Sequence, residues 1–112
     1  MYEYACELVR VIDGDTVVLD IDLGFRTWRR ETVRLAGINA PERKGATFDA
    51  GHNSMAQLKL KLVDKSLVVQ TELDRSDKYG RTLGTIFADG VNVNQRMVNE
   101  GLAVPYGRKP PA

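Results

Sequence analysis

The sequence has little of what several protein classes require. Cys6 is the sole cysteine among 112 residues and His52 is the sole histidine. One thiol allows neither an intrachain disulfide nor a zinc–cysteine cluster, and one imidazole excludes a two-histidine metalloprotease motif. No apolar run approaches membrane-spanning length, and the first four residues lack the basic start and apolar stretch of a signal peptide. We therefore expect no membrane association and favour a cytoplasmic protein over a secreted one.

A strong excess of charge of either sign is also missing. Lysine and arginine number 16 and aspartate and glutamate 15, so the net charge is +1, and global charge does not identify a polyanion binder. The distribution is more informative, because basic residues gather in two segments that flank an acidic turn. The first holds Arg26, Arg29, Arg30, Arg34, Arg43 and Lys44, and the second holds Arg75, Lys78 and Arg81. This grouping fits a polyanion groove, although any single charge of this kind usually belongs to a solvated loop.

The hydrophobic pattern predicts a mainly β domain of the α+β class. Residues 6–12 and 16–21 are rich in β-forming side chains and are separated by Asp13-Gly14-Asp15, which is a strong hairpin signal. After a turn at 23–25, a third strand is expected over 27–38, with Gly37 marking a bulge or a close backbone approach. Fourth and fifth strands are expected over 67–73 and 81–87.

Two segments carry helix signals. Residues 54–65 alternate in part like a strand, but Ser54 and Gln57 form a capping box, which favours a helix. Asn92, with Gln95 three residues on, predicts a short helix that Gly101 ends. Five strands with a helix between the third and fourth match a five-stranded Greek-key OB-fold barrel. We expect one domain over 1–112, with 105–112 as an extended or disordered tail.

The hairpin and the third strand also carry a pattern with chemical meaning. Asp13 and Asp15 are two carboxylates around a glycine, and they repel each other unless a cation lies between them. Arg34 sits in an apolar run, where it is costly unless it meets an anion. Together they suggest a metal-assisted phosphate site. Simpler interpretations are that the aspartates only serve the turn, which we favour for Asp13, and that Arg34 pairs with an acidic neighbour such as Glu42.

Four motifs resemble, in order, those of the staphylococcal nuclease (thermonuclease) homologues. They are residues 11–16 (VIDGDT), residues 33–42 (VRLAGINAPE), residues 77–81 (DKYGR), and Asn94 with residues 100–103 (EGLA). Each alone is weak, but four in sequence over nearly the whole chain are specific. The resemblance implies an OB-fold phosphodiesterase, an endo- or exonuclease, that uses calcium to cleave DNA and RNA with little sequence preference. Magnesium and manganese are alternative ions, and a monomer is implied.

The same resemblance assigns residues to roles. A metal would be held by Asp15, by Asn39 and by the backbone carbonyl of Ala40. Catalysis would rest on Arg34 and Arg81, which bind the phosphate, and on Glu42, commonly assigned to activating water. The residues that hold the nucleotide would be Lys78, Tyr79 and Tyr106.

Two departures from the family pattern keep other functions open. Asn39 stands where a second carboxylate is usual, so the metal site loses a negative charge and affinity should fall. A noncatalytic OB-fold module that binds nucleic acid or protein is therefore an alternative, as is a scaffold component that pairs through its long hairpin. That hairpin, residues 23–31, is longer than in the secreted enzyme. Trp28 within it either covers the edge of the core, which we favour, or stacks on bases. The short chain is more similar to bacteriophage-encoded members, which would place it in an infected bacterial host.

Overall fold

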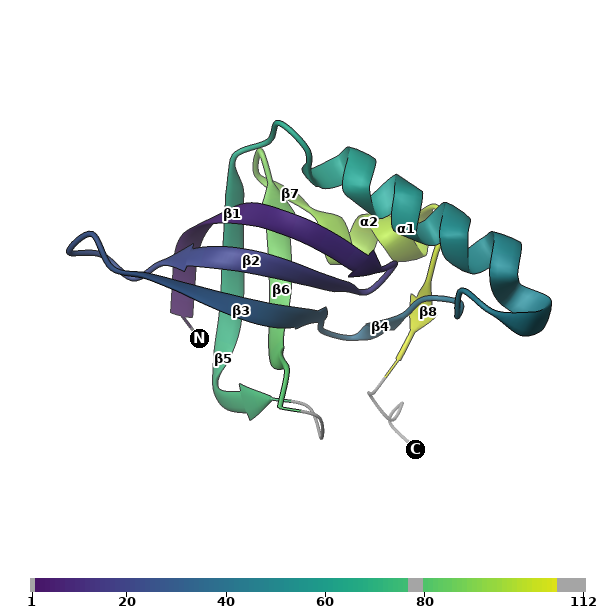
Figure 1. Cartoon of the computed structure of the whole chain (residues 1–112), viewed down its shortest axis with the longest axis horizontal. Coiled ribbons are helices and arrows are strands. Elements are labelled where there is room, and N and C mark those ends of the chain that lie inside the picture. The colour runs from purple at the N-terminus through teal and green to yellow at the C-terminus, as the bar shows by residue number, and fades with distance from the viewer. Residues whose placement is uncertain (1, 77–79, 107–112) are drawn as a thin grey trace.

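The computed structural model describes residues 2–76 and 80–106. Within them, β1 (Tyr2–Asp13), β2 (Thr16–Asp22), β3 (Trp28–Leu35), β5 (Leu67–Ser76), β6 (Thr82–Ala88) and β7 (Val91–Asn92) form one sheet. The strand order is β3-β2-β1-β5-β6-β7, and a parallel pairing of β3 with β6 closes the first five strands into a barrel (Figure 1). This confirms the predicted α+β class and the five-stranded OB-fold barrel.

The predicted hairpin is present, and its first strand is longer than expected. β1 and β2 pair antiparallel with Asp13 opposite Thr16. β1 begins at Tyr2 rather than at Cys6, because its first residues pair with β5, where Tyr2 lies opposite Thr71. This pairing is made between residues far apart in the sequence, so the local pattern gave no sign of it.

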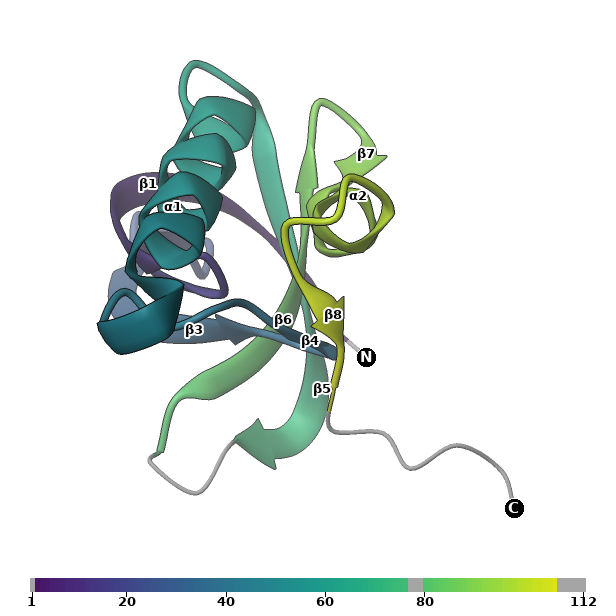
Figure 2. The ribbon, with the colours of Figure 1, turned by 90° about the vertical axis from the view of Figure 1, so that its right-hand side faces the viewer.

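The third strand is interrupted rather than continuous to residue 38. β3 ends at Leu35, and the chain turns through Ala36 and Gly37, whose φ of 78° is natural for glycine. The Gly37 Cα has open space beside it, so the expected close approach is wrong and the turn explains the residue. β4 (Ile38–Asn39) then leaves the barrel and pairs with β8 (Val104–Pro105) below the two helices (Figure 2).

The first helix begins well before the predicted start. A 3₁₀ turn (Gly45–Thr47) leads into α1 (Phe48–Leu62), so Ser54 is an interior residue and the predicted capping box is wrong. Ser54 is buried, and its hydroxyl donates to the backbone carbonyl of Leu102 instead. Tertiary packing, not a local cap, therefore explains the serine.

The second helix follows its prediction. α2 (Val93–Asn99) is capped by Asn92, whose side chain accepts a 3.0 Å hydrogen bond from the Gln95 N–H, and Gly101 adopts φ 73° just beyond its end. Within α2, buried Asn94 donates to the carbonyls of Ala36 (3.0 Å) and Gly84 (3.1 Å), which fastens the helix to the barrel. Both helices pack on the barrel core, to which α1 contributes Leu58 and Leu62 and α2 contributes Val93 and Met97.

Of the predicted tail, Pro105 lies in β8, and the Tyr106 N–H donates a 2.8 Å hydrogen bond to the Gly37 carbonyl. Residues 107–112 lie outside the described residues. Neither helix in the described part of the chain combines the length and apolarity needed to cross a lipid bilayer.

Candidate active site

The turn between β1 and β2 places Asp15 in a nearly closed environment. Its carboxylate accepts a 3.0 Å hydrogen bond at Oδ1 from the Thr16 hydroxyl and a 2.8 Å bond at Oδ2 from the Ala40 N–H. Gly14 makes this approach feasible, because a Cβ there would lie 2.6 Å from Ser54 Cβ and 2.8 Å from Ala40 Cβ. The hairpin turn is thus packed directly against α1 and the segment after β4, and Asp15 is fixed beside Ala40.

Arg34 lies on the neighbouring strand, where Thr16 is its partner across β2 and β3. The side chain is buried, and its Nη1 donates to the carbonyls of Leu35 (3.2 Å) and Ile38 (2.9 Å). Nη1 also lies 3.5 Å from Asp15 Oδ2, so the anion that Arg34 meets is Asp15 and not the expected Glu42.

Asn39 and Tyr106 complete the surroundings of this guanidinium. Nη2 of Arg34 donates to Asn39 Oδ1 at 3.3 Å. The ring of Tyr106 lies with its centroid 5.5 Å from Arg34 Cζ, a cation–π distance. The β4–β8 pairing, in which Asn39 is opposite Val104, brings these two residues to the arginine (Figure 2). Residues far apart in the sequence therefore converge on one cation.

Glu42 extends from the loop after β4 with its side chain exposed to solvent. Its backbone is held firmly: the Thr47 hydroxyl donates a 2.7 Å hydrogen bond to the Glu42 carbonyl. A Cβ on Gly51 of α1 would collide with that same carbonyl, so the helix approaches the loop as closely as a glycine permits. The carboxylate is free to meet a ligand while its peptide group is fixed.

The remaining predicted residues are placed less completely. Arg81 is half-buried and comes just before β6, where the parallel register sets Leu83 opposite Arg34. Arg81 therefore directly precedes the strand that pairs with β3, the strand of Arg34. Lys78 and Tyr79 lie outside the described residues.

Asp13 has a different role from the one expected. Its Oδ1 accepts a 2.7 Å hydrogen bond from Arg43 Nε, and both side chains are partly exposed. The pair ties the β1–β2 turn to the loop that carries Glu42. Arg43 was noted only as part of a basic segment, because no local signal reveals a partner 30 positions away.

The metal ligands expected from the sequence are all oxygens of the type that calcium prefers, but only the Asp15 carboxylate among them is charged. In the structure the Asn39 amide oxygen accepts from the Arg34 guanidinium, and Ala40 contacts Asp15 through its N–H. The Asp15 carboxylate has about four acceptor positions. It accepts two hydrogen bonds, from the Thr16 hydroxyl and the Ala40 N–H, and lies 3.5 Å from Arg34 Nη1. In the described ranges 2–76 and 80–106, no group of three histidine, cysteine, aspartate or glutamate side chains is placed to hold a metal ion.

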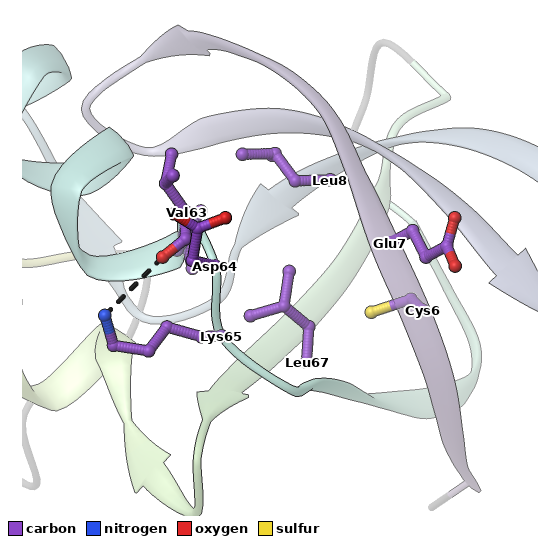
Figure 3. Close-up of a pocket in the computed structure, with 8 residues that line it drawn as sticks. Cys6, Glu7, Leu8, Val63, Asp64, Lys65 and Leu67 are labelled. Carbon is purple, nitrogen blue, oxygen red and sulfur yellow. Dashed lines mark hydrogen bonds between the residues drawn. The ribbon is translucent and has the colours of Figure 1, made fainter.

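A separate shallow pocket lies between β1 and the connection from α1 to β5 (Figure 3). It is lined by Cys6, Glu7, Leu8, Leu62, Val63, Asp64, Lys65 and Leu67. None of the predicted site residues that the structure describes lines it. Burial raises the pKa of the Cys6 thiol to about 11, which leaves it protonated and unreactive at neutral pH. Cys6 is a small buried hydrophobe, as predicted.

The barrel and the Arg34–Asp15 contact define an OB-fold protein with a buried ion pair at the end of β3. The chain belongs to the staphylococcal nuclease homologue family, whose model matches residues 32–112.

Several curated proteins are similar over most of the chain. An uncharacterized endonuclease of Escherichia coli O157:H7 is 43% identical over 101 residues, covering 88% of this chain and 59% of the relative. A micrococcal nuclease of Shigella flexneri is 35% identical over 113 residues, covering 93% and 59%. A thermonuclease of Staphylococcus hyicus is 27% identical over 104 residues, covering 90% and 59%. The chain thus spans about 59% of the length of these relatives.

Proposed function

We propose that the chain is a nuclease domain that hydrolyses phosphodiester bonds in DNA, and in RNA as an alternative substrate, with little sequence preference. One observation carries the proposal: Asp15 and Asn39, from separate segments, both contact the Arg34 guanidinium, and Asp15 also accepts a hydrogen bond from the Ala40 N–H. Membership of the nuclease family and similarity to proteins named as nucleases support it.

Arg34 is suited to hold a phosphate in a fixed orientation. A guanidinium has five N–H donors, and among the described residues three of them bond to the oxygens of Leu35, Ile38 and Asn39. Nε–H and one Nη2–H remain for a phosphate, and they form a fork that matches two oxygens. Because Asp15 and the carbonyls fix the guanidinium in advance, binding a phosphate costs little further ordering.

In hydrolysis, water attacks phosphorus, the bond to the leaving oxygen breaks, and negative charge grows on the nonbridging oxygens. Arg34 on β3 and Arg81 just before β6 would stabilise this charge. Glu42, exposed at the site, would accept a proton from the attacking water. Such contacts reach phosphate and sugar rather than base edges, so weak sequence preference is expected.

A divalent cation, calcium in the first instance, would be held by Asp15, by Asn39 and by the Ala40 carbonyl. Bound there, it would offset the negative charge on a phosphate oxygen and lower the pKa of a water molecule bound to it. With a single carboxylate among these ligands, we expect weak binding that improves when substrate phosphate joins the site.

The test uses the whole chain with plasmid DNA and a single-stranded oligonucleotide in calcium, magnesium, manganese or chelator. We expect cleavage that needs a divalent ion and that falls by about 10²–10³ in Arg81→Ala and in Glu42→Gln. Arg10→Ala and Glu7→Gln, exposed residues of β1, are the matched controls and should retain activity. Binding without cleavage in every ion would instead support the alternative, a noncatalytic OB-fold binding module, which the neutral Asn39 favours.

A further inference from the structure

The β2–β3 hairpin extends beyond the barrel. β3 pairs with β6 only from Val33 to Leu35, so β2 and the earlier residues of β3 form an arm. β1 flanks this arm as far as Ile21 of β2, and beyond Ile21 the arm is two-stranded. The end of this arm, residues 23–28, is called here the hairpin tip. It lies at the opposite end of the molecule from β4 and β8 (Figure 1).

The backbone of the hairpin tip adopts angles that its residues disfavour. Leu23 N–H donates to the Thr27 carbonyl (2.8 Å) and Thr27 N–H to the Gly24 carbonyl (2.9 Å). Phe25 and Arg26 are therefore the central residues of the turn, with φ of 54° and 62°. Positive φ at both central positions favours Asn-Gly, and bulky side chains are disfavoured there. Strained backbone angles at two large side chains suggest that these side chains have a function.

The apolar residues of the hairpin tip are not used in the core. Phe25 is fully exposed at 102%, Trp28 is 49% exposed and Leu23 is 44% exposed. None of them belongs to the core cluster or packs against it. Trp28 is about half exposed, and the interpretation that it covers the edge of the core stays a prediction.

Most charged side chains of the arm have partners, but Arg26 at its end does not in the described part of the chain. Arg30 binds Asp20 through two hydrogen bonds of 2.8 and 3.0 Å, and Arg29 is paired with Glu31. The Asp22 carboxylate accepts the Gly24 N–H at 2.8 Å. Arg26 has no such partner in the described part of the chain, and the hairpin tip contains no acid. An aromatic residue on each side of one unpaired arginine suits a base-and-phosphate ligand.

We propose that the hairpin tip is a second nucleic-acid contact, in which Phe25 and Trp28 stack on bases of a single-stranded segment and Arg26 binds a phosphate. The proposal rests on the proposed function for the identity of the partner. From Trp28 to Arg34 is about 20 Å along β3 at about 3.3 Å per residue. A substrate therefore engages both sites only if it spans at least about 20 Å.

Trp28 is the sole tryptophan in the chain, so its fluorescence reports on the hairpin tip directly. The experiment titrates whole protein in chelator with an oligothymidylate of about 20 nucleotides, chosen to exceed that span. We expect quenching of the Trp28 emission, and an affinity about tenfold weaker in Phe25→Ala and in Arg26→Ala. Leu60→Ala, which removes a residue 66% exposed on α1, is the matched control and should bind like the unchanged protein.

A second measurement separates this proposal from the proposed function. Hydrolysis of a thymidine dinucleotide, too short to reach the hairpin tip, should be equal in Phe25→Ala and the unchanged protein, while cleavage of the long oligonucleotide should slow. Absence of all hydrolysis would overturn the nuclease proposal and leave the fluorescence result intact. Unquenched emission with equal affinities would overturn the hairpin-tip proposal. So would quenching only by anionic phospholipid vesicles, or a dimer in sedimentation that Phe25→Ala dissociates.

Discussion

The hydroxyl of Thr47 donates a 2.7 Å hydrogen bond to the backbone carbonyl of Glu42, five residues earlier in the chain. The same carbonyl faces Gly51 of α1, where any side chain would collide with it. Contacts from the start of α1 therefore fix the loop that carries Glu42, the proposed proton acceptor. A side chain that is exposed but mounted on a fixed peptide group loses little freedom when a substrate arrives.

Thr47→Val should lower kcat by up to about 10²-fold with KM little changed, because a base displaced by about 1 Å still permits substrate to bind. Valine keeps the shape of threonine but cannot donate the hydrogen bond. Steady-state kinetics on a long oligonucleotide would measure the effect.

Thr47→Ser, which retains the hydroxyl, is the control and should preserve most of kcat. Because Thr47 acts through Glu42, Thr47→Val should cost nothing further in a Glu42→Gln background. Equal losses in the Val and Ser variants, or a full additional loss in the double variant, would show that Thr47 does not position Glu42.

Arg34→Lys should reduce activity by about 10²–10³ while the charge at the site is kept. A lysine has no planar fork, so it cannot bond to Ile38 and Asn39 and still present two parallel donors. Comparing hydrolysis rates with urea unfolding would separate chemistry from stability. Arg10→Lys on β1 is the matched control. Full activity in Arg34→Lys would contradict the proposal that two parallel N–H donors of Arg34 bind the phosphate.

Arg34→Ala is a different experiment, since the arginine also supports the fold. Its loss would leave the buried Asp15 carboxylate without a cation and two carbonyls without a donor. We expect this variant to lose stability as well as activity. A loss of activity in Arg34→Ala would therefore report on the fold as well as on the chemistry.

The sequence predicted the parts of the fold that depend on short-range rules. The Asp13-Gly14-Asp15 turn and the Asn92 cap are both present, because their hydrogen bonds and backbone angles are set within a few residues. The start of α1 was missed for the opposite reason. Ser54 looked like a cap, but its hydroxyl bonds to Leu102, and such a contact is invisible to a local pattern.

In the site, too, some features could be predicted from the sequence, and those that depend on distant contacts could not. Asp15, Arg34, Asn39 and Ala40 were predicted to act together, and the structure brings them into contact. Their supports were not predicted: Thr47, Gly51 and the Asp13–Arg43 pair work through backbone contacts or distant partners. Thr16 was within reach of prediction, since a hydroxyl directly after Asp15 can bond to that carboxylate.

Asn39→Asp should tighten calcium binding at least several-fold, because affinity in oxygen-ligand sites rises with the number of charged ligands. Arg34 Nη2, which now contacts the Asn39 amide oxygen, would pair with the new carboxylate and offset part of the gain. Calorimetric titration with calcium, in the absence of nucleic acid, would measure the difference.

Asn53→Asp, on the exposed face of α1, adds the same charge away from the site and is the control. Binding by the Asn39→Asp protein that is no tighter than that of the control would contradict the assignment of Asn39 as a metal ligand.

Glu100→Gln should lower the thermal unfolding midpoint at neutral pH. Lys61 is buried, with its side chain 6% exposed, and its Nζ lies 2.7 Å from Glu100 Oε1, while Arg96 Nη2 lies 2.8 Å from Oε2. Glutamine leaves the buried ammonium without an anion. The hydrogen bonds from Lys61, and then from Arg96, lower the pKa of the Glu100 carboxyl from its ordinary 4.5.

The sign of this shift fixes the pH dependence. A carboxyl whose folded pKa is lowered stabilises the fold at pH values above its ordinary pKa, and the contribution is lost as pH falls through the lowered value. The difference in unfolding midpoint between Glu100→Gln and the unchanged protein should therefore be largest near neutrality and shrink below about pH 4.5. Glu7→Gln, which removes an exposed carboxyl of β1, is the matched control. A difference that stays constant down to strongly acidic pH would mean that packing of the Glu100 side chain, and not its ion pair with Lys61, stabilises the contact of α1 with α2.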